Sequence, residues 1–202
     1  MSLGPDIKLV YDEIGTQINV LGGASGEYID FEISAQATKP FIREYFLSGN
    51  FQYETQAEAG SIVEFVNTAD YYMVMNKTAE QFENEVIEYN CVLYKCNVSG
   101  EILRPSGEVW DAQTYHKVQQ FSLVDSNCYA LQTEPMYGND MDLDEPFGAS
   151  DIKKVFLYIP KSYELQRLDR WQPVSGEYYM VDTILPRRYP AVDLVILEED
   201  NR

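Results

Sequence analysis

The 202-residue chain has 33 acidic and 15 basic side chains, which gives a formal net charge of -18. Proteins that bind nucleic acid through its phosphates need a basic face, so this balance argues against such a function and against binding to an anionic membrane surface. The 45% content of hydrophobic residues is ordinary for a globular protein and excludes general disorder.

The first residues, 1–15, are predicted to form an N-terminal arm that packs on a neighbour. Pro5 favours the start of a short helix. The alternation of Ile7, Leu9 and Tyr11 fits a strand equally well, and both alternatives stay open.

Residues 16–99 are predicted to form a first β unit. Ile29, Phe31 and Ile33 alternate with polar residues, which is typical of a strand with one face in water. The other strands are β-rich runs bounded by turn residues. The predicted strands are 16–21, 27–34, 42–47, 61–66, 71–76 and 85–97.

Residues 100–111 contain two glycines and a proline, and they are predicted to form a linker. Residues 112–202 are then the second β unit. Its predicted strands are 116–124, 128–132, 154–159, a hairpin within 169–181, and 191–198.

Two sequence blocks recur in the same order in the two units. Residues 42–47 (IREYFL) match 152–157 (IKKVFL), and residues 70–74 (DYYMV) match 177–181 (EYYMV). We infer an internal duplication. The predicted fold is therefore all-β, with two similar small antiparallel barrel or sandwich units of about five strands each.

A long polar loop, residues 133–150, distinguishes the second unit from the first. Loops of this length in a compact domain are usually functional or disordered. Its acidic residues lack the spacing and the glycine of a calcium-binding loop, so a solvated acidic loop is favoured over a metal site. These candidate residues are Asp140, Asp142, Asp144 and Glu145.

Arginines are few and gather near the C-terminus. They are candidates for ion pairs with a neighbouring copy, and local pairing with Glu164 or Glu177 is an equally good alternative. The interface candidates are Arg167, Arg170, Arg187, Arg188 and Tyr178.

Catalysis and cofactor binding are not expected. An odd number of cysteines (Cys91, Cys96 and Cys128) without a secretion signal indicates reduced thiols. His116 is the single histidine and has no nucleophile motif near it. No phosphate loop or dinucleotide fingerprint is present, so we predict no enzyme activity, no cofactor and no metal.

The C-terminal half resembles a known family. Leu168-Asp169-Arg170 followed by residues 176–181 (GEYYMV) and the acidic, Arg-terminated tail 198–202 is similar to the SH3-like β-barrels of tailed-bacteriophage head–tail connectors. In that family a polar "gDr" step enters one strand and a "G-x-Y-x-V" strand follows. Gly60-Ser61-Ile62 shows the same step in the first unit without the acid–Arg pair.

The resemblance implies a structural virion protein of the head-closure or stopper type, assembled in the host cytoplasm. Copies would form a ring at the neck around the DNA channel, between portal-side or adaptor proteins and the tail terminator. Loop 133–150 would point into the channel, and the acidic charge would let genomic DNA slide past without specific binding. No membrane partner is expected.

Three other functions compete with this interpretation. The first is a tail or baseplate component of the same virion. The second is a carbohydrate-binding β module, which a line of exposed aromatic side chains on one barrel would favour. The third is a small β-rich hydrolase, which a deep pocket with two carboxylates near His116 would favour.

Overall fold

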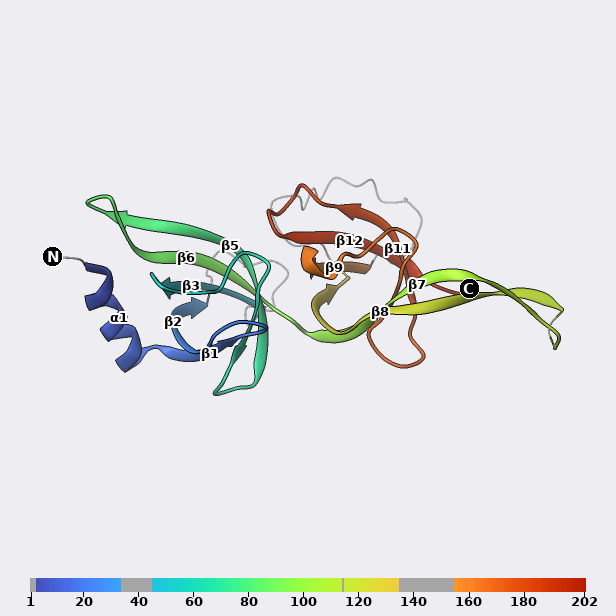
Figure 1. The fold of residues 1–202 in the computed structure, drawn as a ribbon, viewed down its shortest axis with the longest axis horizontal. Coiled ribbons are helices and arrows are strands. Elements are labelled where there is room, and N and C mark those ends of the chain that lie inside the picture. The colour runs from blue at the N-terminus through green and yellow to red at the C-terminus, as the bar shows by residue number, and fades with distance from the viewer. Residues whose placement is uncertain (1–2, 34–44, 114, 135–154) are drawn as a thin grey trace.

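The computed structural model describes residues 3–33, 45–113, 115–134 and 155–202. Two six-stranded antiparallel sheets each close into a barrel, and a helix, α1 (Leu3–Ile14), precedes them. The barrels lie side by side along the long axis of an elongated molecule, with α1 at one end (Figure 1). The all-β prediction with two units is confirmed, and the N-terminal arm is a helix.

Barrel 1 has the strand order β1-β2-β3-β6-β5-β4, and β4 pairs with β1 to close it. Barrel 2 has the order β7-β8-β9-β12-β11-β10, and β10 pairs with β7 to close it. The strands of barrel 1 are β1 (Thr16–Val20), β2 (Ser25–Ile33), β3 (Phe46–Gln52), β4 (Ile62–Phe65), β5 (Asp70–Phe82) and β6 (Glu85–Lys95). Those of barrel 2 are β7 (Val98–Asp111), β8 (His116–Thr133), β9 (Val155–Pro160), β10 (Arg170–Gln172), β11 (Tyr179–Leu185) and β12 (Val192–Glu199), with a 3₁₀ turn, η2 (Lys161–Tyr163), after β9.

The connectivity of the two barrels is the same. If β1 to β6 are matched with β7 to β12 in chain order, every paired neighbour in one barrel has its counterpart in the other. The repeated sequence blocks fall on matched strands, because residues 46–47 and 156–157 lie in β3 and β9, and residues 70–74 and 179–181 lie in β5 and β11. The fold therefore agrees with the inferred duplication.

The entry to β4 shows the local geometry that the two barrels share. Gly60 donates its N–H to the Val74 carbonyl (2.7 Å), and the Val74 N–H donates to the Ser61 carbonyl (3.0 Å). The Ser61 N–H donates to the Glu58 carbonyl (2.9 Å), and Ser61 Oγ accepts from the Glu58 N–H (3.0 Å). Four hydrogen bonds thus fix the turn on β5.

The entry to β10 repeats all four bonds. Leu168 donates to the Val181 carbonyl (2.9 Å), and Val181 donates back to the Asp169 carbonyl (2.9 Å). Asp169 donates to the Gln166 carbonyl (3.1 Å) and accepts the Gln166 N–H on Oδ2 (2.8 Å). Leu168 has a φ of 72°, where Gly60 has 87°, so the chain keeps the left-handed turn although leucine disfavours it.

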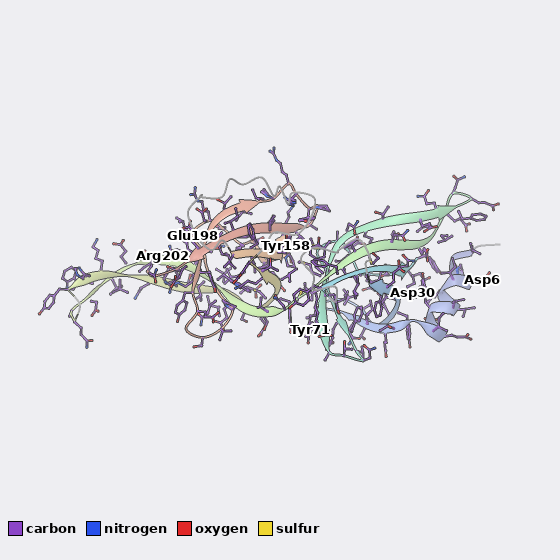
Figure 2. All side chains as sticks on the ribbon, turned by 180° about the vertical axis from the view of Figure 1, so that it is seen from behind. Asp6, Asp30, Tyr71, Tyr158, Glu198 and Arg202 are labelled. Carbon is purple, nitrogen blue, oxygen red and sulfur yellow. The ribbon has the colours of Figure 1, made fainter. Side chains whose placement is uncertain are left out.

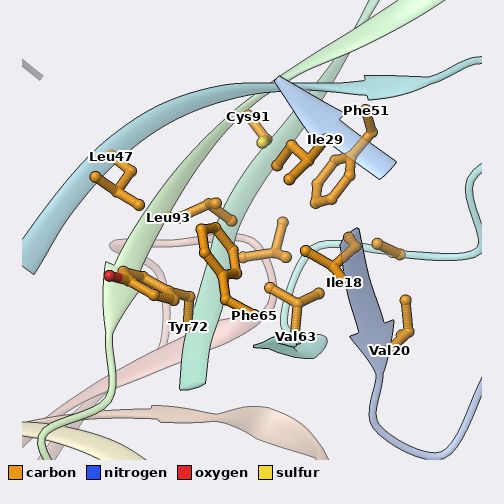
Figure 3. Close-up of a cluster of buried hydrophobic side chains, with 12 residues drawn as sticks. Ile18, Val20, Ile29, Leu47, Phe51, Val63, Phe65, Tyr72, Cys91 and Leu93 are labelled. Carbon is orange, nitrogen blue, oxygen red and sulfur yellow. The ribbon is translucent and has the colours of Figure 1, made fainter. Parts of the chain in front are cut away.

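Each barrel encloses its own apolar core. In barrel 1, side chains including Ile18, Ile29, Phe51 and Leu93 converge between the sheet walls (Figure 3). In barrel 2 the fully buried Trp171 of β10 belongs to a core cluster that also takes residues from the other five strands. Leu47 and Leu157, which the duplication matches, lie in the respective cores, as do Val74 and Val181.

A third apolar cluster joins the barrels. Its buried members are Phe46, Ile62, Met73 and Met75 of barrel 1 and Leu131, Phe156, Tyr158, Val192 and Leu194 of barrel 2. Tyr71 stacks on Tyr129 with ring centroids 4.1 Å apart, and Tyr94 meets Tyr158 edge-on at 5.6 Å. Figure 2 shows Tyr71 and Tyr158 where the barrels meet. Aromatic pairs of this kind contribute about 0.5–1.5 kcal/mol each beyond the area they bury.

Two predictions about the second unit are wrong. Residues 100–111 are not a linker but most of β7. Each barrel has six strands where about five were expected. Gly100 is required by packing, because a Cβ there would lie 2.6 Å from the Gln172 carbonyl and 2.8 Å from the Trp171 ring. Residues 116–133 form one continuous strand, β8, and the predicted turn at 125–127 is an irregularity within it, with Asn127 at a φ of 56°.

Matched core leucines test the duplication. Leu47→Ala and Leu157→Ala are each expected to lower the free energy of unfolding by about 2–5 kcal/mol, because both side chains fill a closed barrel. Leu123→Ala, at a side chain that is 57% exposed, is the control and should change it by less than about 0.5 kcal/mol. Urea unfolding measures all three, and tolerance of either core substitution would contradict the assigned equivalence.

Candidate assembly site: an anchored hairpin arm

A hairpin arm projects from barrel 2 (Figure 1). β7 and β8 have 14 and 18 residues, whereas their counterparts β1 and β2 have 5 and 9. We call residues 105–121 the β7–β8 arm. Its ladder runs from the Pro105–Phe121 pair to the Asp111–His116 pair near the tip. The extra length is an addition to the shared barrel plan.

The arm exposes apolar side chains. Val109 and Val118 face each other across the ladder and are 48% and 45% exposed, and Trp110 is 61% exposed. An isolated two-stranded ribbon is marginally stable in water, and exposed apolar patches mark interaction sites. Contact with another molecule that covers these side chains would therefore stabilise the arm.

The base of the arm is tied to barrel 2 by a buried carboxylate. Arg104, one residue before the arm, donates from Nε to Asp169 Oδ1 (3.0 Å) and from Nη2 to Asp169 Oδ2 (2.9 Å). The Asp169 side chain is only 1% exposed. Arg104 Nη2 also donates to the Glu164 carbonyl (3.0 Å), and the hydrogen bond to Asp169 raises the pKa of Arg104. This two-pronged ion pair fixes the direction in which the arm leaves the barrel.

Arg170, which follows Asp169 in the chain, contacts both the β7–β8 arm and the C-terminal tail. Its guanidinium lies 3.7 Å from the Phe121 ring centroid and 4.7 Å from that of Tyr178. Nε donates to Asp200 Oδ2 at 2.8 Å, and Nη2 donates to the carbonyl of Arg202 at 2.6 Å. Adjacent side chains at 169 and 170 thus join three segments that are distant in sequence.

Asp200 is the acceptor at the centre of this cluster. It receives Arg170 and also the Nε, Nη2 and backbone N–H of Arg202. Burial by itself would raise the pKa of Asp200, but the hydrogen bonds from Arg202 and Arg170 outweigh it and hold that pKa well below its usual range. The carboxylate is therefore charged throughout the physiological pH range. Figure 2 marks Arg202 at the junction of barrel 2 and the arm.

The predicted interface residues have different environments. Arg170 is buried and its charge is neutralised within the chain, so it is not available to a neighbour. Arg167 is 74% exposed at its side chain and lies 3.8 Å from Asp182, and Arg187 is exposed. Arg188 is half-buried beside the Tyr189 ring, and Tyr178 is 37% exposed over Arg170. Two of these arginines pair locally, Arg167 with Asp182 and Arg170 with Asp200.

The candidate loop residues Asp140, Asp142, Asp144 and Glu145 lie outside the described residues. Within the described ranges, no group of three or more His, Cys, Asp and Glu side chains is arranged to hold a metal ion. His116 is exposed near the tip of the arm.

The three cysteines are free thiols. Burial raises the pKa of Cys91 to about 12 and that of Cys128 to about 12, and it also raises the pKa of Cys96. Such thiols are poor nucleophiles at neutral pH.

Sequence reasoning missed the arm because Pro105, Ser106 and Gly107 suggested a linker. In the structure Pro105 pairs with Phe121, and an irregularity between Pro105 and Gly107 accommodates Ser106. A signal was available: Val109-Trp110 and Val118 are β-formers placed symmetrically about a short polar turn. The ion-pair partners of Asp169 and Arg170 carry no such local signal.

Comparisons with protein-family models, with curated proteins and with solved structures found no match to this chain. Among the described residues, no helix has the length and apolarity needed to cross a membrane.

The Asp200→Asn variant tests how the charge of Asp200 contributes to stability at different pH values. Because the folded-state pKa of Asp200 is lowered, its charge contributes stability above the unfolded pKa of about 3.9, and this contribution is lost as pH falls toward the folded value. At pH 7 the substitution should cost about 1.5–3 kcal/mol, the range for hydrogen bonds to charged groups. Urea unfolding should show the gap to wild type narrowing below pH 4.

The matched control is Asp182→Asn, which removes the more exposed ion pair with Arg167. It should change the free energy of unfolding by less than about 0.5 kcal/mol at either pH. A pH-independent gap for Asp200→Asn would mean that the amide disturbs packing and that the charge plays no part.

Proposed function

We propose that this chain is a structural virion protein of a tailed bacteriophage that forms a ring at the neck, around the DNA channel. The observation that carries the proposal is the β7–β8 arm, a hairpin with exposed apolar side chains that extends from a small barrel. It is held at its base by the Arg104–Asp169 ion pair and by the stacking of Arg170 on Phe121. An element held in one direction while apolar side chains on its strands face solvent suits a protein that works by joining to others.

The resemblance to head–tail connectors supports the same function. Its acid–Arg step is Asp169-Arg170, and the Arg-terminated tail ends at Arg202. In this structure the step binds the tail through Asp200, so the residues that carry the resemblance act together. The role of the step is thus mechanical: it fastens two chain segments to the barrel that presents them.

The net charge of -18 supports a channel through which DNA passes without binding. Phosphates are repelled by an acidic wall, and the repulsion extends over roughly 10 Å at 0.1 M salt. Ring formation brings acidic copies together, so it must be driven by apolar contacts. Those contacts are expected to strengthen when salt screens the charges.

Two further functions remain proposals. A tail or baseplate component would use the same arm and the same barrels at another station of the virion. A carbohydrate-binding module is favoured by one observation, a polar hollow of about 630 Å³ on barrel 1, where amide, hydroxyl and carboxylate groups could bind sugar hydroxyls. Its lining includes Asp30, Asn50, Asn76, Thr78 and Asn90.

Electron microscopy of the purified protein tests the ring. At tens of micromolar protein and 0.5 M salt we expect closed rings with a central hole, and fewer rings at 0.05 M salt because the acidic copies then repel one another. Compact monomers under both conditions, together with retention on a glycan array, would replace this function with carbohydrate binding.

DNA binding gives a separate prediction. In gel-shift experiments at 0.05 M salt, where phosphate contacts are strongest, the assembled protein should not retard double-stranded DNA. A basic protein of similar size serves as the positive control. Retardation that disappears at 0.2 M salt would reveal a basic surface and would contradict the proposed channel.

A further inference from the structure

Barrel 1 carries a polar hollow of about 630 Å³ on the outer side of its sheet, lined by side chains of β2, β3, β5 and β6. Leu47 of β3 faces the core of barrel 1, so the next residue, Ser48, faces outward. From Ser48 the paired strands give one row across the outer face: Glu32, Ser48, Val92 and Asn76. The neighbouring row is Asp30, Asn50, Asn90 and Thr78. Both rows line the hollow, and Figure 2 labels Asp30.

In barrel 2 the corresponding row is apolar and covered. Leu157 is the match of Leu47, and the next residue is Tyr158. The pairing of β8, β9, β12 and β11 gives the row through it: Leu131, Tyr158, Leu194 and Leu185. These side chains belong to the apolar cluster that joins the barrels or pack against it, and Tyr158 is fully buried. One copy of the duplicated sheet thus uses this outer face to contact barrel 1, whereas the other copy leaves it open to solvent.

The side chains of the open face indicate which kind of ligand it can take. Two of them, Asp30 and Glu32, carry a carboxylate, and five carry an amide or a hydroxyl group: Ser48, Asn50, Asn76, Thr78 and Asn90. None of the described residues that line the hollow is a lysine or an arginine. An anionic ligand would therefore be repelled. A neutral ligand rich in hydroxyl groups would find both donors and acceptors, because amides and hydroxyls offer both.

Two of the amides are already held in one orientation. Asn76 accepts the Val92 N–H on Oδ1 (2.8 Å), which presents its NH2 group as a donor. Asn90 donates from Nδ2 to Glu80 Oε2 (2.9 Å), which presents its Oδ1 as an acceptor. Side chains that are fixed beforehand lose little freedom when a ligand binds. Phe31 lines the same hollow and is 37% exposed, so it offers an apolar surface to the C–H groups of a sugar ring.

We propose that this hollow binds a neutral oligosaccharide. Three strand spacings of about 4.8 Å make the row of side chains about 14 Å long, which suits a short run of sugar rings. A metal ion fits less well, because no group of three or more His, Cys, Asp and Glu side chains in the described ranges is arranged to hold one. The proposal names the ligand class of the carbohydrate-binding function given above. It holds whether or not the chain forms a ring, since the hollow lies on barrel 1 and the arm on barrel 2.

A glycan array followed by NMR titration tests the site in the full chain. The array carries neutral oligosaccharides of hexoses, pentoses and N-acetylated sugars, with hexagalacturonic acid as an acidic probe and hexalysine as a basic one. We expect retention of a neutral probe and none of hexagalacturonic acid, whose carboxylates would meet Asp30 and Glu32. Titration with the retained probe should shift the side-chain amide signals of Asn50, Asn76 and Asn90. Its dissociation constant should be equal at 0.05 M and 0.5 M salt, because the ligand has no charge to screen.

Two substitutions locate the ligand. Asn90→Ala removes a polar group from the exposed row and should raise the dissociation constant at least about fivefold. Ser48→Tyr places in the hollow the side chain that barrel 2 has at the matched position, and it should raise the constant at least about tenfold by filling the space. The matched controls are Asn67→Ala and Ser175→Tyr, at exposed positions outside the hollow, and both should bind as wild type does. Circular dichroism melting verifies that all four variants are folded.

Each outcome supports or overturns the site, and electron microscopy decides the ring separately. Rings that bind the neutral probe would support both proposals, and monomers that bind it would support the site alone. Retention of no neutral probe, or of hexalysine or hexagalacturonic acid only, would overturn the site and leave the ring untouched. Binding that Ser48→Tyr leaves unchanged would mean that the sugar lies elsewhere and would also overturn it.

Discussion

The structure depends on two adjacent side chains that hold distant segments on one barrel. Asp169 accepts both prongs of Arg104 at the base of the β7–β8 arm, and Arg170 binds Asp200 near the C-terminus while stacking on Phe121. Side chains this buried cannot remain charged without partners, because an unpaired buried charge is strongly destabilising. Asp169 and Arg170 each need a partner of opposite charge, and these partners are what hold the arm and the C-terminal tail on barrel 2.

The turn that carries Asp169 and Arg170 in barrel 2 has a counterpart in barrel 1. The turn before β4 has the same four hydrogen bonds as the turn before β10, with Ser61-Ile62 in place of Asp169-Arg170. Ile62 packs in the apolar cluster between the barrels, whereas Arg170 binds the tail. Ile62 thus packs barrel 1 against barrel 2, and its counterpart Arg170 attaches the arm and the C-terminal tail to barrel 2.

Much of this architecture could be predicted from the sequence. Alternating apolar residues located β2, and the repeated blocks matched β3 with β9 and β5 with β11, because local periodicity and self-similarity need no knowledge of tertiary contacts. β7 was missed because Gly100 and Pro105 have the composition of a linker, although one is small for packing against Trp171 and the other pairs across the ladder.

The candidate site was predictable only in part. Arg170 was predicted as an interface residue, whereas it is buried and pairs with Asp200, 30 residues away. Long-range ion pairs leave no periodic trace in a sequence. The exposure of Trp110 could not be predicted either, since an isolated apolar pair in a strand normally indicates a core. Only the structure distinguishes an apolar residue that faces a core from one that faces solvent.

Amide hydrogen exchange of residues 105–121, in the dilute monomer and in the assembled protein, tests the central claim most directly. If the arm is a surface completed by a partner, its outer amides exchange quickly in the monomer and at least about tenfold more slowly in the assembly, because a marginal two-stranded ribbon becomes covered. Equal exchange in both states, with assembly verified in the same sample, would contradict the account.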